Sequence, residues 1–102
     1  MATFVRVAGV DEVAPGQAKR VDIGGRSIAI FNVDGRYLAI DDACNHRGGP
    51  LSEGQVEGDA VVCPWHGASF SLTTGALLSP PGRGPVNSYP TRVNGQDVEI
   101  GI

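Results

Sequence analysis

Residues 44–67 read CNHRGGPLSEGQVEGDAVVCPWHG and contain both cysteines and both histidines of the chain. These residues form two short pairs, Cys44-Asn45-His46 and Cys63-Pro64-Trp65-His66, with sixteen residues between His46 and Cys63. Each pair offers one thiolate and one imidazole and is followed by glycine, which lets the backbone approach a bound group closely. In a reducing compartment, two such thiols favour metal ligation or catalysis over a structural disulfide.

The sequence on either side of this segment predicts β-hairpins. Paired turn residues lie between short runs rich in β-branched residues, and the favoured two-residue turn needs a positive φ that glycine, asparagine and aspartate tolerate. The predicted hairpins are 17–23 with 26–33 around Gly24-Gly25, 27–33 with 36–40 around Asp34-Gly35, and 89–93 with 96–100 around Asn94-Gly95.

Composition also favours one all-β domain. The 102 residues suffice for a single domain, and 15 glycines and 7 prolines predict many turns and short strands. Further strands are expected at 3–7, 59–62 and 68–72. The segment 79–85, SPPGRGP, is too rich in proline and glycine for a strand or a helix. The one helix candidate is a single turn at 11–14.

The charge pattern excludes several classes of function. The formal net charge is −3 and no basic run occurs, so we expect no nucleic-acid partner. No apolar stretch approaches the roughly 20 residues that span a bilayer, and the first residues lack the features of a signal peptide. We therefore expect a cytoplasmic protein without a membrane partner.

The motif Cys-x-His, then sixteen residues, then Cys-x-x-His resembles the Rieske signature. The layout of the whole chain is similar to that of the ferredoxins of bacterial aromatic-ring dioxygenase systems. This resemblance implies one Rieske domain over 1–102, built of stacked antiparallel sheets. The framework would lie at about 1–41 and 86–102. A loop-rich cluster-binding subdomain would be inserted at about 42–85, with the proline segment covering the cluster.

The same resemblance implies a ligand set. Cys44 and Cys63 would bind one iron of a [2Fe–2S] cluster, His46 and His66 would bind the other, and two sulfides would bridge the irons. Rieske centres differ from plant-type clusters in that two histidines replace two cysteines on one iron. One such cluster is expected in each chain.

The implied function is one-electron transfer from an NAD(P)H-dependent flavin reductase to a terminal oxygenase of the dioxygenase type. Both partners would dock transiently on a monomer. No catalytic residue is expected, because both histidines are already assigned to the cluster and an oxygenase needs a further iron held by two histidines and a carboxylate. The chain is therefore expected to be an electron-transfer component and not an enzyme.

The resemblance also places the reduction potential near the lower end of the Rieske range, roughly −150 to +300 mV. High-potential members carry two extra cysteines where this chain has Gly49 and Trp65. They also carry a serine and a tyrosine that donate to cluster sulfur where this chain has Ala68 and Phe70. Ser69 is one position away, so along a strand its side chain is expected on the opposite face.

Other interpretations remain open. The small Rieske subunit of an assimilatory nitrite reductase is the main alternative. A zinc-stabilised interaction module is another, although zinc sites usually pair cysteine with cysteine and histidine with histidine. A Cys44–Cys63 disulfide is a third. Trp65 is equally compatible with core packing and with a role at the cluster or in docking. Asp41-Asp42 favours capping at a strand end over acid–base chemistry.

Overall fold

The computed structural model describes residues 3–42, 50–65, 67–79 and 84–102, which form eleven β-strands and one short 3-10 helix. Three antiparallel sheets result, with strand orders β1-β11-β10, β2-β3-β4-β9 and β5-β6-β7-β8. The elements are β1 Phe4–Gly9, β2 Ala18–Ile23, β3 Arg26–Val33, β4 Arg36–Asp41, η1 Leu51–Glu53, β5 Gln55–Glu57, β6 Ala60–Val62, β7 Ser69–Ser71, β8 Leu77–Ser79, β9 Ser88–Tyr89, β10 Thr91–Asn94 and β11 Asp97–Gly101. The prediction of an all-β fold is confirmed.

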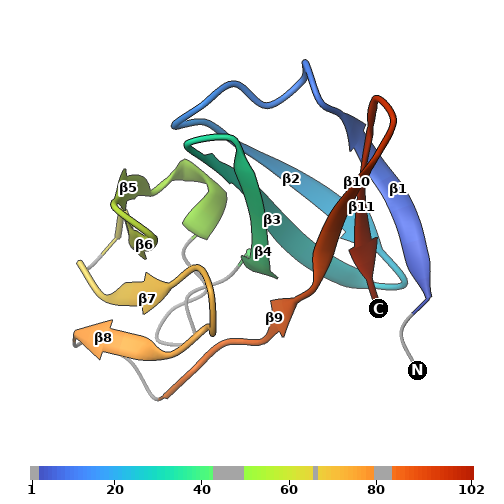
Figure 1. Cartoon of the computed structure of the whole chain (residues 1–102). Coiled ribbons are helices and arrows are strands. Elements are labelled where there is room, and N and C mark those ends of the chain that lie inside the picture. The colour runs from blue at the N-terminus through green and yellow to red at the C-terminus, as the bar shows by residue number, and fades with distance from the viewer. Residues whose placement is uncertain (1–2, 43–49, 66, 80–83) are drawn as a thin grey trace.

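The sheet β2-β3-β4-β9 lies between the other two (Figure 1). Its strand β3 is buried on both faces from Ile28 to Val33. Side chains alternate across a strand, so β3 supplies two cores at once. Ile28 and Ile30 join the core shared with β1 and β11, whereas Ala29 and Phe31 join the core shared with β6 and β7.

The second of these cores connects the framework with the segment that carries the predicted ligands. Phe31 of β3 and Phe70 of β7 are fully buried in it, together with Leu51 of η1. Burying a phenylalanine stabilises a fold by about 1.5–3 kcal/mol. Cys63 belongs to the same core and is 2% exposed. The packing that stabilises the small sheet β5-β6-β7-β8 therefore also fixes one predicted ligand.

Two of the three predicted hairpins form as their turn residues indicate. Gly24 and Gly25 both have positive φ between β2 and β3, and Asp34 and Gly35 do so between β3 and β4. The third hairpin forms one residue later than predicted. Asn94 pairs with Asp97 in the ladder, so the turn consists of Gly95 and Gln96. Only Gly95 has a positive φ there, which suits a turn with glycine at its first central position.

Other predictions need correction. Residues 11–14 are not helical: a turn over residues 9–12, closed by a hydrogen bond from Glu12 N to Gly9 O at 3.0 Å, leads into a bend. The ladder that was expected to begin at 89 is interrupted at Pro90, so that Tyr89 pairs with β4 and β10 begins afterwards. Strands β5 and β8 were not expected.

Among the described residues, no helix has the length and apolar character needed to cross a membrane.

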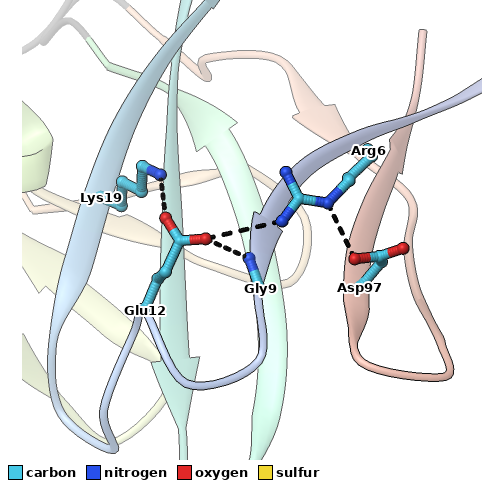
Figure 2. A network of polar contacts seen from close by, with 5 residues as sticks. All are labelled: Arg6, Gly9, Glu12, Lys19 and Asp97. Atoms are coloured by element: carbon cyan, nitrogen blue, oxygen red, sulfur yellow. Dashed lines mark hydrogen bonds and ion pairs between the residues drawn. The ribbon is translucent and has the colours of Figure 1, made fainter.

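A polar network joins β1, β2 and β11 at the outer end of the framework (Figure 2). Glu12 accepts hydrogen bonds from Lys19 Nζ at 2.6 Å and from Gly9 N at 2.7 Å, and Arg6 Nη2 lies 3.7 Å from the same carboxylate. Arg6 Nε also donates to Asp97 at 2.8 Å. These contacts lower the pKa of Glu12, chiefly through the hydrogen bond from Lys19.

This network predicts a pH-dependent stability difference. A carboxyl whose pKa is lower in the folded than in the unfolded state stabilises the fold above its unfolded pKa, and this stabilisation is lost as the pH falls. We expect Glu12→Gln to lower the free energy of unfolding at pH 7, measured by urea denaturation. The deficit should shrink as the pH falls below the ordinary carboxyl pKa of 4.5. Glu57→Gln, at an exposed position, is the control and should behave as wild type; a deficit for Glu12→Gln independent of pH would contradict the prediction.

Candidate metal centre

Of the four predicted ligands, the described part of the structure contains Cys63. Cys44, His46 and His66 lie outside the described residues, as do Gly49 and residues 80–83. Within the described residues, no group of three or more histidine, cysteine, aspartate or glutamate side chains is placed to hold a metal ion. The surroundings of Cys63 and of the described ends of both ligand segments therefore carry the structural argument.

Cys63 follows β6 directly, in the connection that leads to β7. Its backbone N donates to Ala68 O at 2.6 Å, and Gly67 N donates to Cys63 O at 3.1 Å. Gly67 has a φ of +81°, a conformation that glycine adopts without strain. The thiol is thus presented from a tight turn with apolar side chains around it, a position from which a cysteine could ligate a cluster that is held by thiolates. The described member of the donor set fits an iron–sulfur cluster.

Close packing of η1 on β6 fixes the strand that leads into this turn. Gly54 ends η1, and a Cβ there would lie 2.8 Å from Val61 Cγ2 and would also overlap the Val62 carbonyl oxygen. Only glycine lets the two backbones approach this closely. The residue just before Cys63 is therefore held by backbone contact as well as by the sheet.

The side chains of Ala68 and of β7, which follows it directly, face in two directions. Ala68 and Phe70 are fully buried in the core that contains Cys63. The hydroxyl of Ser69 forms a hydrogen bond of 2.7 Å with that of Ser79 on β8. The prediction that Ser69 points to the other face is confirmed. The face of β7 toward Cys63 offers no hydroxyl from these three residues.

The tryptophan of the second ligand pair is on the surface. Trp65 is 55% exposed, and its neighbours Pro64 and Gly67 are exposed too. Of the two roles expected for Trp65, core packing is therefore wrong. The described residues 50–79 carry three acidic side chains and no lysine or arginine, and all three are exposed: Glu53, Glu57 and Asp59.

Asp41 and Asp42 cap the end of β4, as their position before the first ligand pair predicted. Asp42 is 4% exposed; its Oδ1 accepts a hydrogen bond from Ser52 N at 2.6 Å, and Arg20 Nε lies 3.6 Å from its Oδ2. Asp41 accepts hydrogen bonds from Asn87 N at 2.9 Å and Tyr89 OH at 2.6 Å.

The partners of the two aspartates could not be identified from the sequence. Ser52 and Asn87 contribute backbone N–H groups, which any residue except proline can supply, so these contacts left no sequence signal. Burial and, after it, the hydrogen bond to Asp41 raise the pKa of Tyr89.

The segment that returns from the proline-rich residues is anchored on the turn before β8. Val86 N donates to Gly75 O at 2.9 Å, and Val86 is buried in the core that contains Cys63. Gly75 has a φ of +79°, and a Cβ there would overlap the Val86 carbonyl oxygen. Ser79, at the other end of the proline-rich residues, is held through Ser69. Both described ends of that segment are thus fixed to the small sheet.

Comparisons with known proteins agree with this architecture. The protein-family model that describes the Rieske [2Fe-2S] domain matches residues 3–90 of this chain. The chain is similar to the biphenyl dioxygenase ferredoxin subunit of Pseudomonas sp. (strain KKS102), with 44% identity over 96% of this chain and 91% of that protein.

Solved structures share the fold. One is the complex of reduced oxygenase and oxidized ferredoxin in carbazole 1,9a-dioxygenase, where the matched chain gives a TM-score of 0.89 at 30% identity, over 96% of this chain and 92% of that one. Another is a putative NADH-dependent nitrite reductase small subunit from Mycobacterium tuberculosis, with a TM-score of 0.90 at 25% identity, over 100% of this chain and 96% of that one.

The anchor at Gly75 gives a matched pair of variants. Gly25 has nearly the same φ, +81°, but open space around its Cα. Gly25→Ala should lower the free energy of unfolding by about 1–2 kcal/mol from backbone strain alone. Gly75→Ala should lower it by roughly 1–3 kcal/mol more because of overpacking. Chemical denaturation measures both; equal losses would show that the contact with Val86 does not constrain the segment.

Proposed function

The chain belongs to the Rieske [2Fe–2S] domain family, and we propose that it carries single electrons from an NAD(P)H-dependent flavin reductase to a terminal oxygenase of the dioxygenase type. The observation that carries this proposal is the 44% identity with a dioxygenase ferredoxin subunit over nearly the full length of both proteins.

We propose that Cys44 and Cys63 bind one iron of the cluster and that His46 and His66 bind the other. The buried thiol of Cys63 at a hairpin turn supports this assignment. When bound, a Rieske cluster accepts and releases one electron. The protein contributes the fixed turn at Cys63, the apolar core behind it, and backbone anchors for the flanking segments.

The chain is an electron-transfer component and is not itself the catalytic enzyme, as its dioxygenase ferredoxin relatives indicate. The nitrite reductase interpretation receives less support. Its structural counterpart is 25% identical to this chain, against 44% for the biphenyl dioxygenase ferredoxin. A carrier of this kind should purify free of a large partner, whereas a subunit should copurify with one.

The described surface of the cluster-binding region supports a docking role. Trp65 is exposed two residues after Cys63, and residues 50–79 carry the exposed acidic residues Glu53, Glu57 and Asp59 and no lysine or arginine. Such a surface suits transient docking to basic partners, with electrostatic steering that salt weakens. A ferredoxin–oxygenase complex is known for the carbazole dioxygenase system, which supports this mode for the present chain.

We further propose that residues 1–102 form one Rieske domain, with the framework at about 1–41 and 86–102 and the cluster-binding region at about 42–85. The central sheet supports this division, because it packs one core against each part. We propose that the protein works as a monomer in the cytoplasm, where NAD(P)H is available to the reductase.

The test of the proposed function is an EPR spectrum of the dithionite-reduced, purified protein, with iron and zinc assayed on the same sample. We expect a rhombic signal typical of mixed imidazole–thiolate ligation and two irons per chain. Cys63→Ser should lose most of the iron. A colourless, EPR-silent protein that contains one zinc would overturn the electron-carrier proposal in favour of a zinc-stabilised module.

The apolar face of β7 predicts the reduction potential. Hydrogen bonds to cluster sulfur stabilise the reduced state, and neither Ala68 nor Phe70 can donate one from its side chain. We therefore expect a potential in the lower part of the Rieske range, roughly −150 to +300 mV. Phe70→Tyr should raise it in a dye-mediated redox titration.

The matched control for this titration is Phe31→Tyr. Phe31 is equally buried in the same core but lies on β3 of the framework. It should lose similar stability, because both variants bury a hydroxyl in apolar surroundings. If both variants shift the potential equally, the hydroxyl near the cluster is not the cause.

A further inference from the structure

We propose that Asp41 and Asp42 are positioning residues for the cluster. Asp42 holds the chain at Ser52, soon after the segment that carries the first ligand pair, and Asp41 holds it at Asn87, soon after the proline-rich segment. This inference rests on the proposed function, because it concerns the same cluster. It goes beyond that function in assigning these two carboxylates the task of fixing both segments to a single framework strand.

The contacts of Asp42 join the end of β4 to the part of the chain that follows the first ligand pair. The chain leaves β4 at Asp42, and its carboxylate accepts a hydrogen bond from the backbone of Ser52, ten residues later in η1. Asp42 N also donates to Ser27 O on β3 at 2.9 Å. The same residue thus joins the central sheet to the point where the chain has returned from Cys44 and His46.

The contacts of Asp41 do the same for the other segment. Asp41 N donates to Asn87 O at 3.0 Å, and the carboxylate accepts the hydrogen bond from Asn87 N. The hydroxyl of Tyr89 donates to the second carboxylate oxygen. Three hydrogen bonds therefore fix the chain a few residues after the proline-rich stretch and on the strand that leads to the first ligand pair.

The chemistry of these contacts suits positioning. Hydrogen bonds to a charged group are stronger than those between neutral groups, and backbone donors have little freedom to reorient. Asp42 is buried, and Arg20 lies beside its Oδ2 atom. That oxygen accepts no hydrogen bond within the described residues. A small displacement of this carboxylate would leave both Ser52 N and the negative charge poorly paired. The arrangement is therefore sensitive to side-chain length at this position.

The experiment compares holoprotein variants of both residues. Asp41→Ala and Asp42→Ala remove the carboxylates, Asp41→Asn and Asp42→Asn keep an acceptor oxygen at the same position, and Asp42→Glu keeps the charge but moves it by one methylene. Asp97→Ala is the stability control, because it removes the ion pair with Arg6 at 2.8 Å in the remote sheet. The readouts are the EPR g values and line widths of the reduced protein and the rate of iron release to a chelator.

We expect the alanine variants to shift or broaden the EPR signal and to release iron about tenfold faster, a change that one lost charge-assisted hydrogen bond can produce. Asp42→Asn keeps the acceptor for Ser52 N and should restore both readouts, whereas Asp41→Asn keeps one of two acceptors and should restore them in part. Asp97→Ala should leave the EPR signal unchanged even if it lowers the unfolding midpoint. Should Asp42→Ala fail to fold, Asp42→Glu decides: a perturbed signal beside a normal Asp42→Asn supports positioning.

The inference is overturned if the folded variants, Asp42→Glu included, keep the wild-type EPR signal and release rate, whatever their stability. It is also overturned if Asp97→Ala perturbs the signal as much as they do. A wild-type protein without the cluster signal would instead refute the proposed function. The two failures are therefore distinguishable on the same set of samples.

Discussion

Strand β3 has apolar side chains on both faces, so its sheet must be covered on both sides. Sheet β1-β11-β10 covers one face, and η1 with β6 and β7 covers the other. The small sheet has strands of only three residues, and such a sheet has little stability of its own. The stability of this sheet depends on the packing of its Phe70, together with Leu51 of η1, against β3. The framework and the candidate metal centre are consequently one packing unit that shares a strand.

The end of β4 links this packing to the chain segments that flank the candidate metal centre. β4 pairs with β3 from Arg36 to Asp41, so its end is fixed by a neighbour that is itself buried on both faces. The first ligand pair begins three residues beyond that point. Hydrogen bonds then join the chain at Ser52 to Asp42 and the chain at Asn87 to Asp41, so that both later segments are bound at the end of β4. Rigidity of this kind suits electron transfer, where the geometry around the redox centre should change little between oxidation states.

The sequence predicted the parts of the fold that depend on local backbone conformation. Gly24-Gly25 and Asp34-Gly35 specify hairpins because few other residues accept the positive φ that both turns require. Strands β5 and β8 were missed because they hold neither the paired β-branched residues of β6 nor the aromatic residue of β7. The shift at Gly95 arises because the ladder from β10 to β11 sets the register, and one glycine suits two neighbouring turns. The predicted ligand pattern rests on the spacing of cysteines and histidines in the sequence, whereas anchors such as Ser52 N use backbone atoms that every sequence supplies.

Phe70 shows how closely the core and the redox properties of this protein are linked. It lies on the face of β7 that packs against β3, and that face is also the one toward Cys63. A side chain there must be large and apolar to join the two sheets, and such a side chain offers no hydrogen bond to sulfur. Ser69 has the hydroxyl, but the two-residue repeat of the strand turns it toward Ser79, where it stabilises the pairing of β7 with β8. One strand therefore divides its residues between packing and sheet pairing. The low potential expected for the cluster follows from that division.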